Sequence, residues 1–200
     1  GKTTIFRLIV GETMPDEGQV AKPDKTVVGY YSQSIDEMRG RTVIEEVKSA
    51  AGNLTKMAAE LAQLETRLSE PMDDDEMMKA VERYGELQGE YERLGGYDLD
   101  SRASEILTGL GIPPEDQGRM TESFSGGWKM RIALAKILAL QPDVLLMDEP
   151  TNHLDIESIV WLESWLKSYK GSVLMTSHDR EFMNRIVGRI FEVAHKTITV

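Results

Sequence analysis

Residues 144–155 read VLLMDEPTNHLD, and this stretch narrows the possible folds of the chain more than any other. Its apolar residues predict a buried strand that ends on two adjacent carboxylates, Asp148 and Glu149. Strands are also predicted at 26–31 and 172–177, helices at 2–10, 125–140, 156–168 and 179–187, and a hairpin near the C-terminus that turns at Ala194 and His195. Because strands alternate with helices, we expect an α/β fold with a largely parallel sheet, whose ligands collect at the carboxyl ends of the strands.

The acid pair suits nucleotide hydrolysis. One carboxylate can hold Mg²⁺, usually through water, and the next can orient a water molecule for attack on a γ-phosphate. Such pairs often follow apolar strands by chance, but the PTNHLD that comes next makes this one far more specific. His178 lies just past the third apolar strand, where a neutral imidazole can bond a γ-phosphate or the attacking water, although a lone histidine is more often structural. Gln33, after the first strand, can reach the metal or the water.

Two glycine-containing stretches suit phosphate binding. Gly1-Lys2-Thr3-Thr4 matches the end of a phosphate-binding loop, G-x-x-x-x-G-K-[ST], and leads straight into the first predicted helix. Alone, this partial match is weak evidence. In SFSGGWK at 123–129, Ser125 is a good helix N-cap, and Gly126 and Gly127 let backbone N–H groups approach an anion closely. The alternative is a plain capped helix whose glycines serve a turn, and the acidic strand just downstream disfavours it.

Composition excludes several classes of protein. The chain has no cysteine and therefore no disulfide framework, so a reducing, cytoplasmic location is the simplest. It contains no apolar run of about 18 residues and no secretory signal pattern, so we expect no membrane partner. The net charge of −11 argues against a broad electrostatic grip on nucleic acid, although not against a local basic contact.

No strand is predicted between Leu54 and Leu94. Apolar residues recur there at spacings of three and four, the pattern of two helices packed on each other; they are Leu54, Met57, Leu61, Leu64 and Leu68, then Met77, Ala80, Tyr84, Leu87, Tyr91 and Leu94. Pro71 and the acids at 73–75 suit the turn between them. The segment is either an ordinary helical subdomain or a hairpin, each helix about 20–30 Å long, that projects toward a partner. We expect the acidic cluster at 73–76, at the tip, to contact a protein or a basic segment.

Taken together, GKTT, YYSQ, SFSGGWK, LLMDEPTNHLD and TSHD resemble the motifs of the ATP-binding cassette (ABC) ATPases, in the family's order and over nearly the whole chain. The resemblance implies a P-loop NTPase core that binds ATP and Mg²⁺. It also implies a role for each matching residue: Gly1 in the phosphate loop, Lys2 on the β- and γ-phosphates, Thr3 and Asp148 on Mg²⁺, Thr4 on the α-phosphate, Gln33 as a sensor of metal and γ-phosphate, Glu149 as general base and His178 as switch histidine. Asp155 then belongs to the loop that crosses the interface between two cassettes. Ser125, Gly126 and Gly127 then close over the ATP of the second cassette.

Within that family, the details most resemble the ABC-F class, soluble proteins with two cassettes that act on the ribosome. The signature reads SGGW in place of the transporter-like SGGQ, and the hairpin lies where that class carries its arm. The resemblance implies ATP-gated binding near the ribosomal exit site for tRNA. The implied partners are rRNA, tRNA, ribosomal proteins and a second cassette of the same polypeptide. The expected organisation is an ATPase core at 1–50, an inserted helical arm at 51–97, a helical signature subdomain at 98–140 and the remaining core at 141–200.

Three alternatives remain. The ATPase subunit of an ABC transporter uses the same chemistry without the hairpin, a DNA-repair cassette carries a much longer coiled coil, and a catalytically idle module does not need the acid pair or His178. The resemblance further implies that these residues begin inside the phosphate loop, so we expect its first half and the strand that feeds it to be missing here. We therefore expect these 200 residues alone to bind ATP poorly, to be inactive and to leave one sheet position unpaired.

Overall fold

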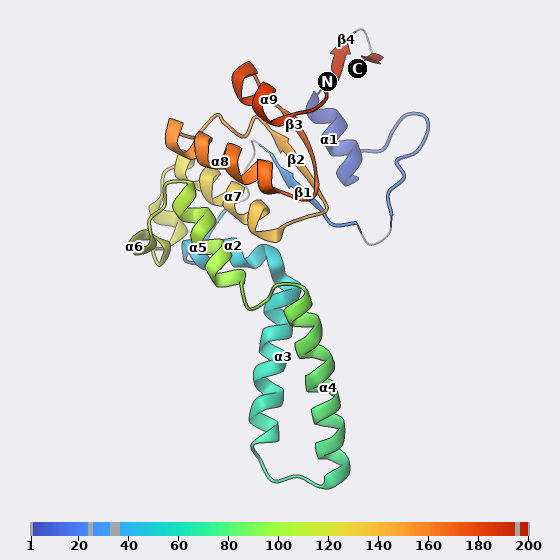
Figure 1. The fold of residues 1–200 in the computed structure, drawn as a ribbon, viewed down its shortest axis with the longest axis vertical. Helices are drawn as coiled ribbons and strands as arrows, with labels where there is room; N and C mark the ends of the chain where they lie inside the picture. The colour runs from blue at the N-terminus through green and yellow to red at the C-terminus, as the bar shows by residue number, and fades with distance from the viewer. Residues whose placement is uncertain (1, 24–25, 33–36, 195–196, 200) are drawn as a thin grey trace.

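The computed structural model describes residues 2–23, 26–32, 37–194 and 197–199 (Figure 1). Three residues that the sequence singles out, Gly1, Gln33 and His195, lie outside these ranges. Across the described ranges, no helix combines the length and the apolar composition that crossing a membrane requires.

A parallel sheet of three strands forms the centre of the described chain. Its strands are β1 (Val28–Tyr31), β2 (Val144–Asp148) and β3 (Ser172–Thr176), in the order β1-β2-β3. The predicted parallel sheet is thus confirmed. β1 begins two residues later than predicted, because the amide of Val27 donates to the Asp143 carboxylate instead of joining the strand ladder.

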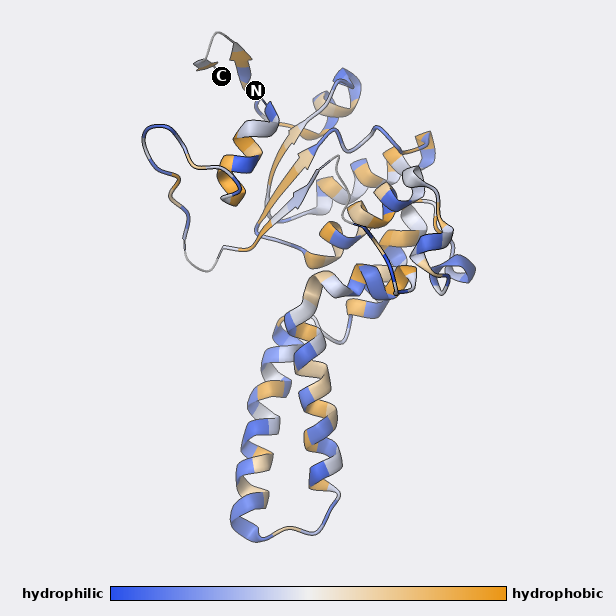
Figure 2. Cartoon of the chain, turned by 180° about the vertical axis from the view of Figure 1, so that it is seen from behind, coloured by the Kyte–Doolittle hydropathy of each residue, from blue (hydrophilic) through white to orange (hydrophobic). Residues whose placement is uncertain are grey.

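Helices cover both faces of the sheet (Figure 1). On one face, α7 (Gly126–Leu140) and α8 (Ile156–Ser168) pack on Tyr31, Leu145 and Met147, whereas α1 (Lys2–Val10) covers the other face and places Phe6 against Tyr30. Side chains alternate between the faces of a strand, so strands covered on both sides must be apolar throughout. Figure 2 shows hydrophobic colouring along much of the sheet, with paler residues in one strand. The fourth predicted helix is α9 (Arg180–Ile186), which Asp179 caps.

The segment without predicted strands forms two helices that project from the core (Figure 1). They are α3 (Gly52–Leu68) and α4 (Asp74–Arg93), and Asp73 caps the second, followed by three acids in its first turn. Leu54, Met57 and Leu61 pack against Leu87, as the spacing predicts. Two predicted contacts are wrong: Met77 and Leu94 are exposed, because they lie at the ends of α4, beyond the buried cluster between the helices.

Several helical segments were not predicted individually. They are α2 (Val43–Lys48), α5 (Leu99–Gly109), α6 (Pro114–Gln117) and the 3₁₀ turns η1 (Ser49–Ala51) and η2 (Thr121–Ser123). The start of α2 does carry a sequence signal, because Thr42 and Glu45 form a capping box, each side chain bonding the other's backbone N–H.

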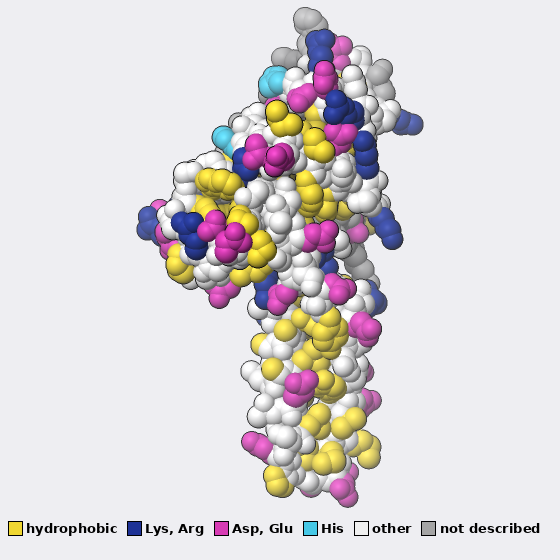
Figure 3. Space-filling view, turned by 60° about the vertical axis from the view of Figure 1, so that its left-hand side comes forward, with side chains coloured by type: hydrophobic (Ala, Val, Ile, Leu, Met, Phe, Trp, Pro, Cys, Tyr) yellow, Lys and Arg dark blue, Asp and Glu magenta, His cyan; other side chains and the backbone are white. Residues whose placement is uncertain are grey.

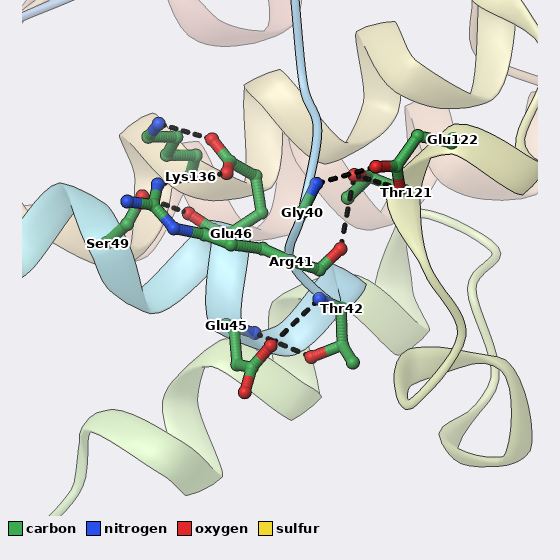
Figure 4. A network of polar contacts seen from close by, with 9 residues as sticks. All are labelled: Gly40, Arg41, Thr42, Glu45, Glu46, Ser49, Thr121, Glu122 and Lys136. Carbon is green, nitrogen blue, oxygen red and sulfur yellow. Dashed lines mark hydrogen bonds and ion pairs between the residues drawn. The ribbon is translucent and has the colours of Figure 1, made fainter.

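A polar network joins the base of the hairpin to the signature helix (Figure 4). Glu46 on α2 is buried and binds Lys136 of α7 at 2.5 Å and Arg41 at 3.3 Å. Beside it, Gly40 donates to Glu122, and the hydroxyl of Thr121 donates to the carbonyl of Arg41. The chain before α2 is thereby tied to the chain before α7.

The C-terminal residues form the predicted hairpin, with β4 (Glu192–Ala194) antiparallel to β5 (Thr197–Thr199). In the described part of the chain, β3 pairs with β2 and has no strand on its other side. A cavity of about 690 Å³ lies there, lined by Lys2, Phe6, Val173, Met175 and residues of α9 and the hairpin. The expected unpaired sheet position and the expected inactivity of these residues alone both stay predictions.

Candidate nucleotide site

Asp148 lies at the carboxyl end of β2, between two hydroxyl groups. One carboxylate oxygen accepts a hydrogen bond from Thr3 Oγ1 at 2.7 Å, and the other accepts one from Thr176 Oγ1 at 2.6 Å. Only 7% of Asp148 is exposed. Thr3 and Asp148, the two residues predicted to bind one metal ion, are therefore in direct contact. Thr176 is a site residue that sequence reasoning missed, and its place at the end of an apolar strand was the available signal.

Glu149 follows in a conformation that is rare for a residue with a side chain. Its φ angle is 52°, in the left-handed region, which costs about 1 kcal/mol for most residues and persists where surrounding contacts enforce it. Its amide donates to the carbonyl and the hydroxyl of Thr176, each at 3.1 Å. The bend after β2 thus turns the Glu149 side chain toward β3 and its following loop.

His178 and Glu149 meet at two points. The His178 amide donates to one Glu149 carboxylate oxygen at 3.1 Å, and its Nε2 lies 3.3 Å from the other. Glu149 is buried, whereas 84% of the His178 side chain is exposed. The backbone amide of His178 thus orients the Glu149 carboxylate, while the imidazole stays accessible to a ligand. The structure brings together the acid and the histidine that the sequence placed after different strands.

The first residues of α1 complete this side of the site. Lys2 and Thr4 are exposed at the helix N-terminus, where backbone N–H groups and the helix dipole favour an anion. Tyr30 lies behind, with its hydroxyl buried and without a hydrogen-bond partner among the described residues. Burial raises the pKa of Tyr30, and the nearby Asp148 charge raises it further.

The signature residues lie apart from this cluster. Ser125 occupies the N-cap position of α7, and its backbone carbonyl accepts the first helical bond, from Lys129 N–H. The expected cap bond is absent, because the Ser125 hydroxyl accepts no amide of the helix. A Cβ on Gly126 or Gly127 would meet no other atom, so both backbones are open to a ligand. Ser125 lines a cavity of about 240 Å³ with Arg119, Phe124 and Trp128, and neither Asp148 nor Glu149 borders it.

Asp155 has a structural partner that the sequence did not reveal. One of its oxygens accepts the Ser158 amide at 2.8 Å and caps α8, and the other binds Arg131 at 2.8 Å. Arg131 itself lies over the ring of Trp128, with its guanidinium carbon 4.5 Å from the centroid. The Ser158 amide first, and Arg131 next, lower the pKa of Asp155 from 3.8 to about 2.

Asp155→Asn should therefore cost stability in a pH-dependent way. Asparagine keeps the cap acceptor but loses the charge, and because 53% of the Asp155 side chain is exposed we expect a loss of at most about 1 kcal/mol at pH 7. The folded pKa lies below the unfolded one, so this contribution is present above pH 3.8 and is lost as the pH falls toward 2. Urea unfolding of the full-length protein at pH 7 and pH 3 measures the stability difference between the variant and the parent. A gap between variant and parent that is equal at both pH values would contradict the assignment.

The donor set fits Mg²⁺. Thr3 and Asp148 supply a hydroxyl and a carboxylate within 2.7 Å of each other, and both are hard oxygen ligands. Among the described residues, no group of three or more His, Cys, Asp or Glu side chains could enclose a metal ion.

Known proteins with similar sequences match most of this chain. The family model described as "ABC transporter" matches residues 1–152. The chain is 38% identical over 193 residues to the tylosin resistance ATP-binding protein TlrC of Streptomyces fradiae, covering 96% of this chain and 35% of that protein. It is 37% identical over 195 residues to ABC transporter F family member 5 of Arabidopsis thaliana, covering 96% of this chain and 28% of that protein. The chain thus spans about a third of the length of these relatives.

Solved structures are similar in fold. The ATP-binding subunit of an ABC transporter superposes with a TM-score of 0.65 at 18% identity, over 93% of this chain and 67% of that one. The archaeal ribosome recycling factor aABCE1, solved with the ribosomal stalk protein aP1, gives a TM-score of 0.61 at 22% identity, over 96% of this chain and 29% of that one. At these identities the likeness shows the shared fold and no more.

Proposed function

The chain belongs to the ABC transporter family, as a cassette of the ABC-F type, and we propose that it hydrolyses ATP to control binding of its parent protein to the ribosome. ATP binding and hydrolysis are the general chemistry of the family. The observation that supports hydrolysis in this chain is the cluster at the carboxyl ends of β2 and β3. There Thr3 bonds Asp148 and His178 contacts Glu149, and Thr176 bonds both acidic residues.

The chemistry follows from these positions. The phosphates are bound by Lys2, Thr4 and the N-terminus of α1. Thr3 and Asp148 would hold Mg²⁺, which would offset phosphate charge. Glu149 orients a water molecule and accepts its proton as the water oxygen attacks the γ-phosphorus. The bond to the β-phosphate oxygen breaks, and ADP and phosphate leave. His178 holds Glu149 and the γ-phosphate region, and Gln33 is assigned to metal and γ-phosphate by resemblance alone.

We further propose that the site works in pairs. The signature segment lies apart from the acid pair of its own chain, and its backbone is open at Gly126 and Gly127, beside Ser125. This position suits contact with ATP bound to a second cassette. Asp155, beside Trp128 and Arg131, then lies near the surface between the two cassettes.

Ribosome binding is favoured over membrane transport by the α3–α4 hairpin. A transporter's ATPase subunit requires a groove for a membrane partner and has no need of a projecting helical pair. In the ABC-F class an arm at this position accompanies action on the ribosome. The alternative function, an ATPase subunit of an ABC transporter, remains the competitor to test.

Sedimentation of the full-length protein separates the two. The Glu149→Gln variant, which we expect to bind ATP without turnover, is added to lysate with ATP or ADP, and ribosomes and membranes are then separated. We expect at least about tenfold more protein with ribosomes in ATP than in ADP. Co-sedimentation of the protein with membranes would establish the transporter alternative. An equal amount of protein with ribosomes in ATP and in ADP would refute ATP-gated ribosome binding.

A further inference from the structure

One face of α4 carries no charged side chain over three helical turns, and the part nearest the hairpin tip is exposed and apolar. It begins near the hairpin tip with Met77, Met78 and Val81, of which Met78 is 68% and Val81 55% exposed. Helical spacing continues the same face through Gly85, Gln88 and Gly89, of which Gln88 is half-buried and donates from its amide to the Tyr97 hydroxyl at 3.4 Å. We call these six residues the α4 stripe. Figure 3 shows hydrophobic side chains along the hairpin as far as its tip, with acidic side chains beside them.

The stripe does not hold the hairpin together. Contact with α3 uses a different face of α4, on which Ala80 and Leu87 are buried and Tyr84 and Tyr91 are packed. A Cβ on Gly85 or Gly89 would meet no atom, so no internal contact requires glycine at either position. Glycine inside an exposed helix costs about 1 kcal/mol relative to alanine. Because glycine has no side chain, the backbone of a second helix can pack closely against α4 at Gly85 and Gly89.

Unpaired acids border the stripe. Asp75, Glu82 and Glu86 follow one edge of it at helical spacing, and within the described residues none of the three forms an ion pair or a hydrogen bond. Residues 52–93 contain eleven acidic and five basic side chains, a net charge of −6. This charge repels nucleic acid phosphates and a second copy of the same hairpin.

We propose that the α4 stripe docks a basic, amphipathic α-helix of a partner protein. The apolar face of that helix covers Met77, Met78 and Val81, its backbone approaches Gly85 and Gly89, and its Lys or Arg residues pair with the acidic edge. This surface lies on the hairpin and not at the ATPase site. Its test uses a peptide in place of ribosomes, so the result does not depend on ribosome binding.

The test uses the full-length protein and a fluorescent helical peptide of about 16 residues, with leucines at i, i+3, i+4 and i+7 and lysines elsewhere. A scrambled peptide of the same composition and a single-stranded RNA are the competing probes. Met78→Gln combined with Val81→Gln removes apolar surface without changing charge. Gly85→Leu blocks close approach while favouring the helix. Met14→Gln, at a methionine that is 89% exposed outside the hairpin, is the matched control.

We expect the helical peptide to bind at least tenfold more tightly than the scrambled peptide or the RNA. Both stripe variants should weaken it at least tenfold, and Met14→Gln should not. Gly85→Leu should weaken peptide binding while its melting temperature stays unchanged or rises, which excludes unfolding as the cause. Equal binding of the two peptides, unaffected binding by the stripe variants, or preference for RNA would each overturn the proposal.

Discussion

Replacing Glu149 by glutamine should reduce the ATP turnover of the full-length protein by at least about 100-fold, because loss of a positioned general base typically costs a factor of 10²–10⁴. The amide has nearly the shape of the carboxylate and can still accept the His178 amide, now at 3.1 Å from a Glu149 oxygen. It cannot take a proton from water. ATP binding should therefore stay within about threefold of the parent, since the phosphates are bound by other residues.

Steady-state phosphate release and binding of a fluorescent ATP analogue measure these two quantities. Glu181→Gln is the matched control: this acid is also carried near the end of β3, but 85% of its side chain is exposed and its partner is Arg185. The control should keep parental turnover. The assay is made with the equivalent acid of the second cassette replaced in parent and variant alike, and turnover by Glu149→Gln above about a tenth of the parental value would then mean that another group is the base.

Replacing Lys136 by methionine should lower the free energy of unfolding by about 2–3 kcal/mol. Removing one partner of a buried ion pair leaves an uncompensated charge, which typically costs about 3–5 kcal/mol. Here only 7% of the Glu46 side chain is exposed, but Arg41 remains as a second partner and reduces the loss (Figure 4). Urea unfolding monitored by tryptophan fluorescence provides the measurement.

A double-mutant cycle isolates the pair. Glu46→Leu with Lys136→Met replaces both charges by apolar groups, and we expect the double variant to be more stable than Lys136→Met alone by about 1–2 kcal/mol. Arg93→Met, in an exposed pair with Glu90, should change stability by less than about 0.5 kcal/mol. Additive effects of Glu46 and Lys136 would show that the two charges do not stabilise each other.

The elements of the core were largely predictable. β2 and α8 have the predicted bounds, and α7 begins one residue later than predicted. These segments are long, strongly patterned and bounded by turns, so local sequence suffices to identify them. The short helices α2, α5 and α6 were missed individually, although the Thr42–Glu45 capping box marks the first of them.

The candidate site was predictable as a set of motifs, but not as a set of contacts. Asp148, Glu149 and His178 were chosen because each follows an apolar strand. Thr176, which binds Asp148, and Arg131, which binds Asp155, belong to no motif that the sequence displayed. The cap bond expected of Ser125 is absent, because a residue type favours a cap but does not enforce its geometry.

The sequence alone determined the parallel α/β class, the two helices of the hairpin and the chemistry of the acid pair, because periodicity and motif spacing are local properties. Only the tertiary structure decided which residues meet. Thr3 and Asp148 are 145 positions apart, and Glu46 and Lys136 are 90 apart. Such contacts depend on strand order and register, which are set by how all the apolar faces pack at once and which no local pattern encodes.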